Sequence, residues 1–350
     1  MISDNPKITI LLATFNRAHL IGETLDSILA QTYINWECLI VDDHSKDGTE
    51  GVITEYIEKD SRFEYYKKTD NYQPGLSGTR NYGLDLAAER NSEFIQFFDD
   101  DDIMHPQKLE LQIEPLLNDT NFDLSICCYR KFHKLETIEF DLDKADDHSC
   151  NIKTKNLLKA FYLNQINLNS PGPLWKAQVL LGYRFNEDLY YAEERDFYLR
   201  IFLHENLEYY PVDEILFWYR KHDMAITSNL YVNSKVKQDS HLLFQENFKN
   251  EVLQKSYADT YFIKSFLTIA IQNNDKTSIK QIRNYIYENL NIFNLGYIIN
   301  TSSADDESSQ ILTIPAHSVI QIINLGEGYS VGDANNDGII NYFDVWELTQ

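Results

Sequence analysis

Four consecutive aspartates, Asp99 to Asp102, follow the apolar run FIQFF at residues 94–98. Neighbouring carboxylates repel one another, so their position at the end of a buried-strand pattern needs a physical reason. Two other polar clusters also end predicted strands: ATFNR at 13–17 and VDDHSKDGT at 41–49. The carboxyl ends of parallel strands meet at one edge of a sheet, where ligands bind. The three clusters are therefore expected to lie together.

Acidic groups that converge on one edge need a compensating charge, and a divalent cation is the simplest source of it. Mg²⁺ and Mn²⁺ prefer carboxylate oxygens and share their coordination with substrate phosphates. We therefore expect the aspartates to lie in a pocket where a metal bridges carboxylate and diphosphate, with Asp102 pointing away or capping the next helix. For the aspartates alone, a solvated acidic loop that caps this helix is the alternative.

The elements that must position these clusters follow an alternating pattern. Strand-like runs cover residues 7–14, 36–41, 63–67, 94–98 and 123–129, and helix-like runs cover 19–31, 49–57, 77–89 and 107–118. This alternation predicts an α/β fold with a mostly parallel sheet flanked by helices. An aromatic strand at 215–220 follows, and then a polar helical region from 234 to about 291.

Composition narrows the classes of protein. The 350 residues are 43% hydrophobic, which is ample for a packed core, and their net charge of −23 should repel nucleic acid and anionic membranes. The four cysteines lack zinc spacing and are interpreted as free thiols in a reduced compartment. Neither a signal peptide nor a run of roughly 18 apolar residues is found, so we expect no transmembrane segment and a cytoplasmic location, with peripheral association at the inner membrane face as an option.

Several motifs together resemble one enzyme family. TFNRAHLIGETLDSILAQTYINWECLIVDDHSKDGT (14–49) resembles the nucleotide-binding segment of the family-2, GT-A-fold (Rossmann-like) glycosyltransferases. GTRNYGLDLA (78–87) and FIQFFDDDDIMHPQKLE (94–110) are similar to their Arg-Asn segment and DXD motif. GYRFNEDLYYAEERDFYLRI (182–201) and WYRKH (218–222) resemble the acceptor-side segment and the segment that often supplies a histidine. The resemblance covers residues 5–230 in the family's order.

The resemblance implies roles for individual residues. The nucleotide-sugar would be bound by Thr14, Asn16, Asp42, Asp43, Arg80, Asp99 and Asp100. The metal, Mn²⁺ or Mg²⁺, would be held by Asp99, Asp101 and His222. A carboxylate can accept from a uracil N–H, which favours UDP, and the fork of donors on arginine suits phosphate or base. The alternative for the histidine is a surface position beside Lys221.

The catalytic base is expected in the segment AEERDF. The family pattern is Glu-Asp, whereas this chain has Glu193-Glu194, so Glu194 stands where the family has aspartate. Its carboxylate is one methylene longer, and Asp196 is a nearby alternative. In an inverting transfer one such base deprotonates the acceptor hydroxyl. The other interpretation is that these acids and Arg195 are charges on a helix surface.

The last segment carries a different motif. DANNDGIINYFD, residues 333–344, has the spacing of an EF-hand-type calcium loop. Its ligands would be Asp333, Asn335, Asp337, the carbonyl of Ile339, Asn341 and Asp344. Aspartate at the last position resembles one half of a dockerin, which would imply Ca²⁺ and a cohesin-type partner outside the cell. That location conflicts with the use of a nucleotide-sugar in the cytoplasm.

We therefore predict a metal-dependent inverting glycosyltransferase that moves a sugar from a nucleotide-sugar, with UDP preferred, to a glycan or lipid-linked acceptor. The expected domains are residues 1–230 for catalysis, 231–298 for a helical extension, and 299–350 for a linker, strand and calcium loop. Two other functions stay open. A non-catalytic nucleotide-sugar-binding protein is favoured by the Glu194 departure, and a calcium-dependent extracellular assembly protein by residues 333–344.

Overall fold

The computed structural model describes residues 5–133, 138–142, 151–221, 234–255, 258 and 260–289, with the short segments 296–298 and 320–322. The chain divides into two compact units, residues 1–248 and 249–350. The catalytic boundary expected at residue 230 stays a prediction. The calcium loop at 333–344 and His222 lie outside the described residues.

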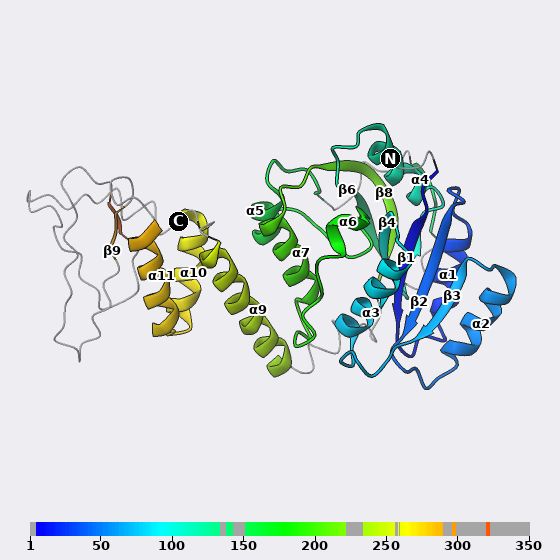
Figure 1. Ribbon diagram of the computed structural model, residues 1–350, viewed down its shortest axis with the longest axis horizontal. Helices are drawn as coiled ribbons and strands as arrows, with labels where there is room; N and C mark the ends of the chain where they lie inside the picture. Colours follow the sequence, from blue (N-terminus) through cyan, green and yellow to red (C-terminus); the bar gives the residue numbers. More distant parts are fainter. Residues whose placement is uncertain are drawn as a thin grey trace, which may run out of the picture. The chain divides into compact units, whose positions relative to one another are not determined.

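One eight-stranded sheet forms the centre of the first unit (Figure 1). Its strands lie in the order β3-β2-β1-β4-β7-β6-β8-β5. Their bounds are β1 (Ile8–Thr14), β2 (Trp36–Asp42), β3 (Phe63–Lys67), β4 (Phe94–Asp99), β5 (Ile103–Met104), β6 (Leu124–His133), β7 (Pro173–Lys176) and β8 (Tyr209–Lys221). The sheet is mostly parallel, but β7 pairs antiparallel with β4 and β6, and β5 pairs antiparallel with β8. The mostly parallel α/β sheet predicted from the sequence is confirmed.

The register of β1 brings the polar clusters to one edge of the sheet. Thr14 at the end of β1 lies opposite Asp42 on β2, and Ala13 lies opposite Asp99 on β4. All three strands run in parallel and end at the same level, so the residues that follow them emerge side by side. The predicted convergence of the three clusters therefore follows directly from the strand pairing.

Helices cover both faces of the sheet. In the first unit they are α1 (Ile21–Leu29), α2 (Thr49–Lys59), α3 (Leu76–Glu89), α4 (Lys108–Asn118), α5 (Leu157–Tyr162), α6 (Ala177–Leu180) and α7 (Glu193–His204). In Figure 1, α3 lies on one face of β1 to β3, and α1 and α2 lie on the other. The start of α3 needs glycine, because a Cβ at Gly78 would come within 2.2 Å of the Gln73 carbonyl oxygen.

The second unit contains helices and a small strand pair. Helix α9 (Ser234–Gln254) crosses the division between the units, and α10 (Thr260–Gln272) and α11 (Lys276–Asn289) follow. Phe262, Leu267 and Ile282 are among its fully buried side chains. Strands β9 (Gly296–Ile298) and β10 (Ile320–Ile322) pair in parallel. The helical extension predicted for residues 234 to 291 matches these three helices.

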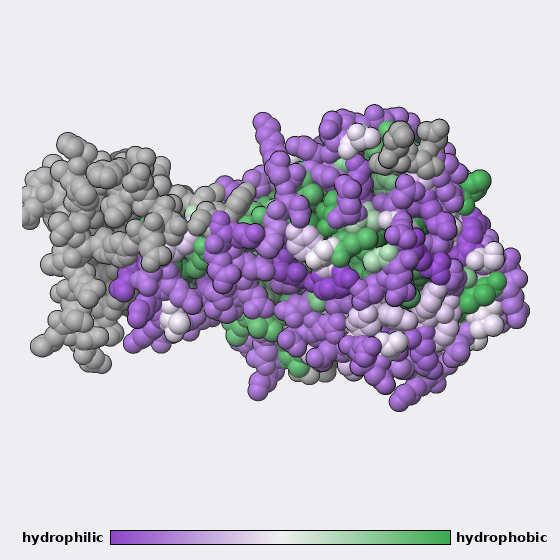
Figure 2. Space-filling model, viewed as in Figure 1, coloured by the Kyte–Doolittle hydropathy of each residue, from purple (hydrophilic) through white to green (hydrophobic). Residues whose placement is uncertain are grey.

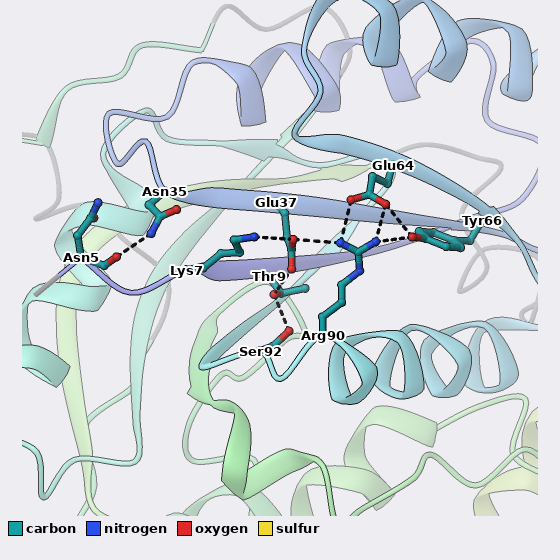
Figure 3. Close-up of polar contacts among 9 residues, drawn as sticks. All are labelled: Asn5, Lys7, Thr9, Asn35, Glu37, Glu64, Tyr66, Arg90 and Ser92. Carbon is teal, nitrogen blue, oxygen red and sulfur yellow. Dashed lines mark hydrogen bonds and ion pairs between the residues drawn. The ribbon is translucent and has the colours of Figure 1, made fainter. Parts of the chain in front are cut away.

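A closed polar network occupies the amino ends of the strands, opposite the cluster edge (Figure 3). Arg90, just after α3, donates to Glu64 at 2.9 Å and to Glu37 at 3.3 Å. Thr9 donates to Glu37 at 2.9 Å and shares a hydrogen bond with Ser92 at 2.7 Å. Each carboxylate here has cationic and hydroxyl partners, and the hydrogen bonds to Tyr66 and Arg90 lower the pKa of Glu64 against the effect of burial.

The described surface is mostly polar. The face in Figure 2 is largely hydrophilic, with smaller hydrophobic areas between the polar ones. Within the described part of the chain, no helix is long and apolar enough to cross a membrane. Cys38, Cys127 and Cys128 are buried free thiols, as the sequence predicted for them.

The last aspartate of the run, Asp102, forms part of the protein interior. Asp102 is fully buried, and its Oδ1 accepts from the backbone N–H of Arg220 at 2.9 Å. The Arg220 guanidinium donates to the Asp101 carbonyl at 2.6 Å and to Glu23 at 2.6 Å. Asp102 therefore points away into the protein and does not cap the following helix, because β5 pairs with the end of β8 and brings Arg220 onto the turn.

This position predicts how substitutions at residue 102 affect folding. Asp102→Ala leaves the buried Arg220 N–H without an acceptor and should lower the free energy of unfolding by about 1–3 kcal/mol. Asp102→Asn keeps the acceptor oxygen and should lower it less. Denaturant unfolding at one pH measures both values, and equal losses in the two variants would argue against this hydrogen bond.

The same position predicts a pH effect. Burial, and then the charges of Asp101 and Asp99, raise the pKa of Asp102 well above its usual value. The folded state therefore disfavours the ionised form, and wild-type stability from this group is fully present below about pH 4 and declines as the pH rises. The difference in free energy of unfolding between wild type and Asp102→Asn should therefore shift in favour of the variant as the pH rises above about 4. A difference that stays constant as the pH rises would contradict the shift.

Candidate active site

The aspartate turn after β4 is balanced by arginines from other elements. Arg80, buried on α3, donates to Asp99 at 2.8 Å. Arg17, in the loop after β1, places Nε 3.3 Å from Asp100 and 3.9 Å from Asp101. Each pair joins a residue of the DXD segment to a segment distant in sequence, so the turn is held by charges from both sides.

The arginines do not remove the crowding of negative charge. Burial, and then Asp101, raise the pKa of Asp100 to about 7, although Arg17 opposes the shift. Burial also raises the pKa of Asp99, against the charge of Arg80. A further positive charge nearby would favour the ionised forms of both carboxyl groups. The turn therefore has the electrostatic character of a cation-binding or phosphate-metal site.

The loop after β2 uses its acids in internal contacts. Asp42 is buried and accepts from Ser45 N at 2.8 Å, Ser45 Oγ at 2.6 Å and Tyr65 OH at 2.7 Å. Asp43 accepts from Gly75 N at 2.6 Å and forms an ion pair with Lys68. Asp42 therefore shapes the loop, while Asp43 ties it to the start of α3, where Gly75 has a φ of +112°.

Asn16 joins the first two polar clusters. Its side-chain oxygen accepts from Lys46 N at 2.8 Å, and its own N–H donates to Ser45 Oγ at 2.8 Å. The backbone at Asn16 has a φ of +54°, a conformation that asparagine tolerates better than most residues. The loops after β1 and β2 thus form one connected surface beside the aspartate turn.

Glu194 lies at the start of α7, close enough to Arg80 for the two charges to interact. Burial raises the pKa of Glu194 to about 8, while the charge of Arg80 opposes the rise and that of Asp99 adds to it. Glu193 has a raised pKa for the same first reason. Ala192 before them has a φ of +63°, so the chain turns sharply into the helix. Arg80 therefore links the DXD segment and the acceptor-side acids electrostatically.

The alternative base has a different environment. Asp196 is buried and accepts from Arg200 Nε at 2.9 Å, one turn further along α7. Burial raises its pKa, and the ion pair with Arg200 opposes the rise. Arg200 also donates to the Arg184 carbonyl at 2.7 Å. Asp196 is thus engaged in fixing α7 to residue 184, whereas Glu194 lies in the field of Arg80 and Asp99.

Buried polar atoms without a hydrogen bond of normal geometry gather at this edge. They are Thr14 Oγ1, Arg17 Nε, Arg80 Nη1, Ser170 Oγ, Glu194 Oε1 and Tyr198 OH. Atoms of the same kind also occur away from this edge, for example Trp36 Nε1. A polar ligand bound at this edge would give the six atoms partners. A nucleotide-sugar, with its diphosphate and hydroxyl oxygens, has the matching chemistry.

Sequence patterns did not identify several residues that build the site. Arg17 and Arg220 lie inside the quoted motifs ATFNR and WYRKH, but the sequence assigned no role to either arginine. Asn81 holds α3 to the acceptor side through Glu187 at 2.7 Å and the Phe185 carbonyl at 3.0 Å. Among the described residues, no group of three or more His, Cys, Asp or Glu is arranged as a metal cluster.

Comparison with known proteins identifies the family. The family model "Glycosyl transferase family 2" matches residues 9–166. An uncharacterised glycosyltransferase of Rickettsia typhi, RT0329, is 30% identical over 234 residues, 65% of this chain and 68% of that protein. The β-1,3-glucosyltransferase WfgD of Escherichia coli is 40% identical over 114 residues, 33% of this chain. The match spans only 42% of the length of WfgD.

The fold has a counterpart among solved structures. Residues 1–349 of TarS from S. aureus, crystallised with UDP-GlcNAc, superpose with a TM-score of 0.57 at 19% sequence identity. The match covers 80% of this chain and 79% of that one, which confirms the predicted GT-A-type α/β fold. The family model covers the strands that carry the aspartate turn, and the Rickettsia typhi relative is matched over 68% of its length. The chain therefore belongs to glycosyl transferase family 2.

Proposed function

We propose that this chain is an inverting glycosyltransferase that uses a UDP-sugar and a divalent cation. The observation that carries the proposal is the single edge where Arg80 lies between the aspartate turn and Glu194. The donor would lie against the loops after β1, β2 and β4, and the acceptor would approach from the start of α7. A side chain able to take a proton thus stands across from the groups that would hold the diphosphate.

The nucleotide would be bound by the residues that the resemblance implies. Thr14 ends β1 and Asn16 lies on the loop after it, and Asp43 on the loop after β2 keeps an orientation fixed by Lys68 and Gly75. In this proposal, Asp42 acts mainly by shaping its loop, since its carboxylate already accepts three hydrogen bonds. Arg17 adds a cation at the same edge, where an acidic protein needs one for a phosphate-bearing donor.

The proposed reaction needs one base. Glu194 would take the proton of the acceptor hydroxyl, whose oxygen attacks the anomeric carbon from the face opposite the nucleotide. The bond from that carbon to the diphosphate oxygen breaks, and the released UDP carries the negative charge. Arg80 would hold Asp99 on the donor side and stabilise the ionised form of Glu194 on the acceptor side, because its guanidinium pairs with Asp99 and interacts electrostatically with Glu194.

The donor set of the aspartate turn fits a hard divalent cation. Asp99 and Asp101 would supply carboxylate oxygens, and His222, outside the described residues, is the third proposed ligand. Bound there, Mn²⁺ or Mg²⁺ would stabilise the charge that develops on the diphosphate. The protein contributes the placement of the turn, which Arg17, Arg80 and Arg220 hold from three directions.

The relatives suggest a donor and an acceptor to test first. WfgD is named as a UDP-glucose:GlcNAc-diphosphoundecaprenol β-1,3-glucosyltransferase. A Campylobacter jejuni relative, 29% identical over 185 residues, 53% of this chain and 56% of its own length, is named as a β-1,3-glucosyltransferase for a glycan on undecaprenol diphosphate. We propose UDP-glucose and an undecaprenyl-diphosphate-linked sugar as the first pair to assay, with the protein at the cytoplasmic side of the membrane.

Calcium binding by residues 333–344 is a separate proposal that rests on the spacing of the loop alone. It favours the second candidate function, an assembly protein with a cohesin-type partner. Calorimetric titration of the intact chain with Ca²⁺ tests it, and an absence of heat would leave the segment as an acidic tail.

Glu194→Gln should lower the rate of sugar transfer by about 10²–10⁴, because the amide keeps the shape of the side chain but cannot accept the proton. Affinity for the UDP-sugar should barely change, since the donor is bound on the strand loops. Steady-state kinetics and calorimetry measure the two effects. Asp196→Asn is the control and should cost much less activity; an inactive Asp196→Asn beside a normal Glu194→Gln would move the base to residue 196.

The pH profile should also identify the base. Only ionised Glu194 can accept a proton, and burial raises its pKa to about 8. The rate of transfer at low substrate concentration should therefore rise with pH to a plateau above about pH 8. An ordinary glutamate, with a pKa of about 4.3, would give a level profile from pH 6 to 9, and that result would contradict the assignment.

Asp101→Ala should abolish transfer and weaken UDP binding in the presence of Mn²⁺, because the cation loses a protein ligand. Asp102→Asn is a matched control, since it alters the next carboxylate while preserving the hydrogen bond to Arg220. Activity assays and UDP titrations with Mn²⁺ or EDTA make the comparison. Full wild-type activity in EDTA, or equal losses in both variants, would count against the metal role of Asp101.

A further inference from the structure

A fully buried lysine lies in the centre of the first unit. Lys108 on α4 has no exposed surface, and burial lowers its pKa to about 8. Its ammonium group donates to Gln96 Oε1 at 2.7 Å and also to Gln112 Oε1. Burying a charged group is costly, and its partners, these two amides and the Cys127 thiol, are neutral groups. An arrangement of this cost calls for a role beyond packing.

Lys108 sets the orientation of both amide side chains. An amide has one acceptor oxygen and one NH₂ donor, so holding both oxygens turns both NH₂ groups away from the lysine. Gln96 Nε2 then donates to the Pro171 carbonyl at 3.0 Å, and Gln112 Nε2 donates to the Gly172 carbonyl at 2.8 Å. One ammonium group thereby orients two donors onto consecutive carbonyls of a single turn.

That turn carries Ser170. It closes with a hydrogen bond from Gly172 N to the Asn169 carbonyl at 2.9 Å, and a Cβ at Gly172 would approach that oxygen to 3.2 Å. Ser170 is fully buried, and its hydroxyl lies near Glu194, where it opposes the rise in the pKa of Glu194 that burial causes. Tyr198, one helical turn after Glu194, lies beside the same hydroxyl.

The relation between Ser170 and Glu194 is sensitive to small movements. Ser170 Oγ and Glu194 Oε1 are both buried without a hydrogen bond of normal geometry. The position of the 169–172 turn therefore sets how closely the Ser170 hydroxyl approaches the Glu194 carboxylate. Catalytic groups must be held to within about 0.5 Å by their supporting residues.

We propose that Lys108, Gln96 and Gln112 form a positioning network for the base, which holds the 169–172 turn so that Ser170 orients Glu194 toward the acceptor. The inference rests on the proposed function, since it concerns the base of that reaction. Lys108 is a positioning residue and touches no substrate. Its effect passes through two amides, one turn and one hydroxyl.

Two substitutions separate this role from simple packing. Gln112→Glu keeps the shape of the side chain and gives Lys108 a carboxylate partner, but removes the Gln112 donor to the Gly172 carbonyl. That carbonyl still accepts from Cys127 N at 3.2 Å and from Cys127 Sγ at 3.3 Å. Ser125→Ala is the control, because Ser125 is also fully buried and its hydroxyl donates to the backbone carbonyl of Gln112 at 2.7 Å. It removes a buried hydroxyl from the same region without altering the donors to the turn.

The experiment compares Lys108→Met, Gln112→Glu, Ser170→Ala and Ser125→Ala with wild type by kcat, donor KM, UDP affinity and Tm. The first three should lower kcat about tenfold or more and leave donor KM and UDP affinity within about twofold, while Ser125→Ala keeps kcat. Gln112→Glu combined with Ser170→Ala should be no worse than Ser170→Ala alone, because both act through one hydroxyl. An unchanged kcat in Gln112→Glu, or losses that multiply in the double variant, would overturn the proposal.

Failure of the proposed function gives a different result, namely a wild-type protein that transfers no sugar from any UDP-sugar. A crystal structure of Gln112→Glu then decides the question for the network alone. Displacement of Ser170 away from Glu194 supports it, and an unchanged 169–172 turn overturns it. Because Gln112→Glu retains a buried ion pair, it also serves if Lys108→Met does not fold.

Discussion

Repulsion among carboxylates at the carboxyl edge of the sheet is the constraint on which the candidate site depends. Parallel strands of matched register deliver Asp99 to this edge, next to the end of β1. Arginines from three other segments then lie against the turn: Arg80 on α3, Arg17 after β1 and Arg220 on β8. The turn is thereby fixed in place, and in the proposed function its remaining negative charge would be balanced by a cation that arrives with the donor.

The two edges of the same sheet differ in how their polar groups are paired. At the amino ends, Arg90 is shared between Glu37 and Glu64, and the network is closed and satisfied. At the carboxyl ends, Arg80 Nη1 and Glu194 Oε1 are buried without a hydrogen bond of normal geometry. In the proposed function, a bound polar substrate would give these atoms partners.

Much of this arrangement could be predicted from the sequence, because short apolar runs in regular alternation define parallel strands and their polar ends share an edge. The runs at 36–41 and 94–98 match β2 and β4 to within one residue. Strand β7 could not be predicted, since its antiparallel pairing with β4 depends on contacts distant in sequence. Lys108 was missed for a similar reason: a lysine in an amphipathic helix is expected at the surface, and only tertiary packing shows that it is buried.

Stereochemistry tests the central claim most directly. The protein is incubated with Mn²⁺, a UDP-α-sugar such as UDP-glucose, and an undecaprenyl-diphosphate-linked acceptor, and the new glycosidic bond is followed by NMR. A single displacement assisted by Glu194 inverts the anomeric carbon, so the account predicts a β-linked product together with one UDP released for each sugar transferred. An α-linked product, or no transfer from any UDP-sugar to this acceptor or to water, would contradict it.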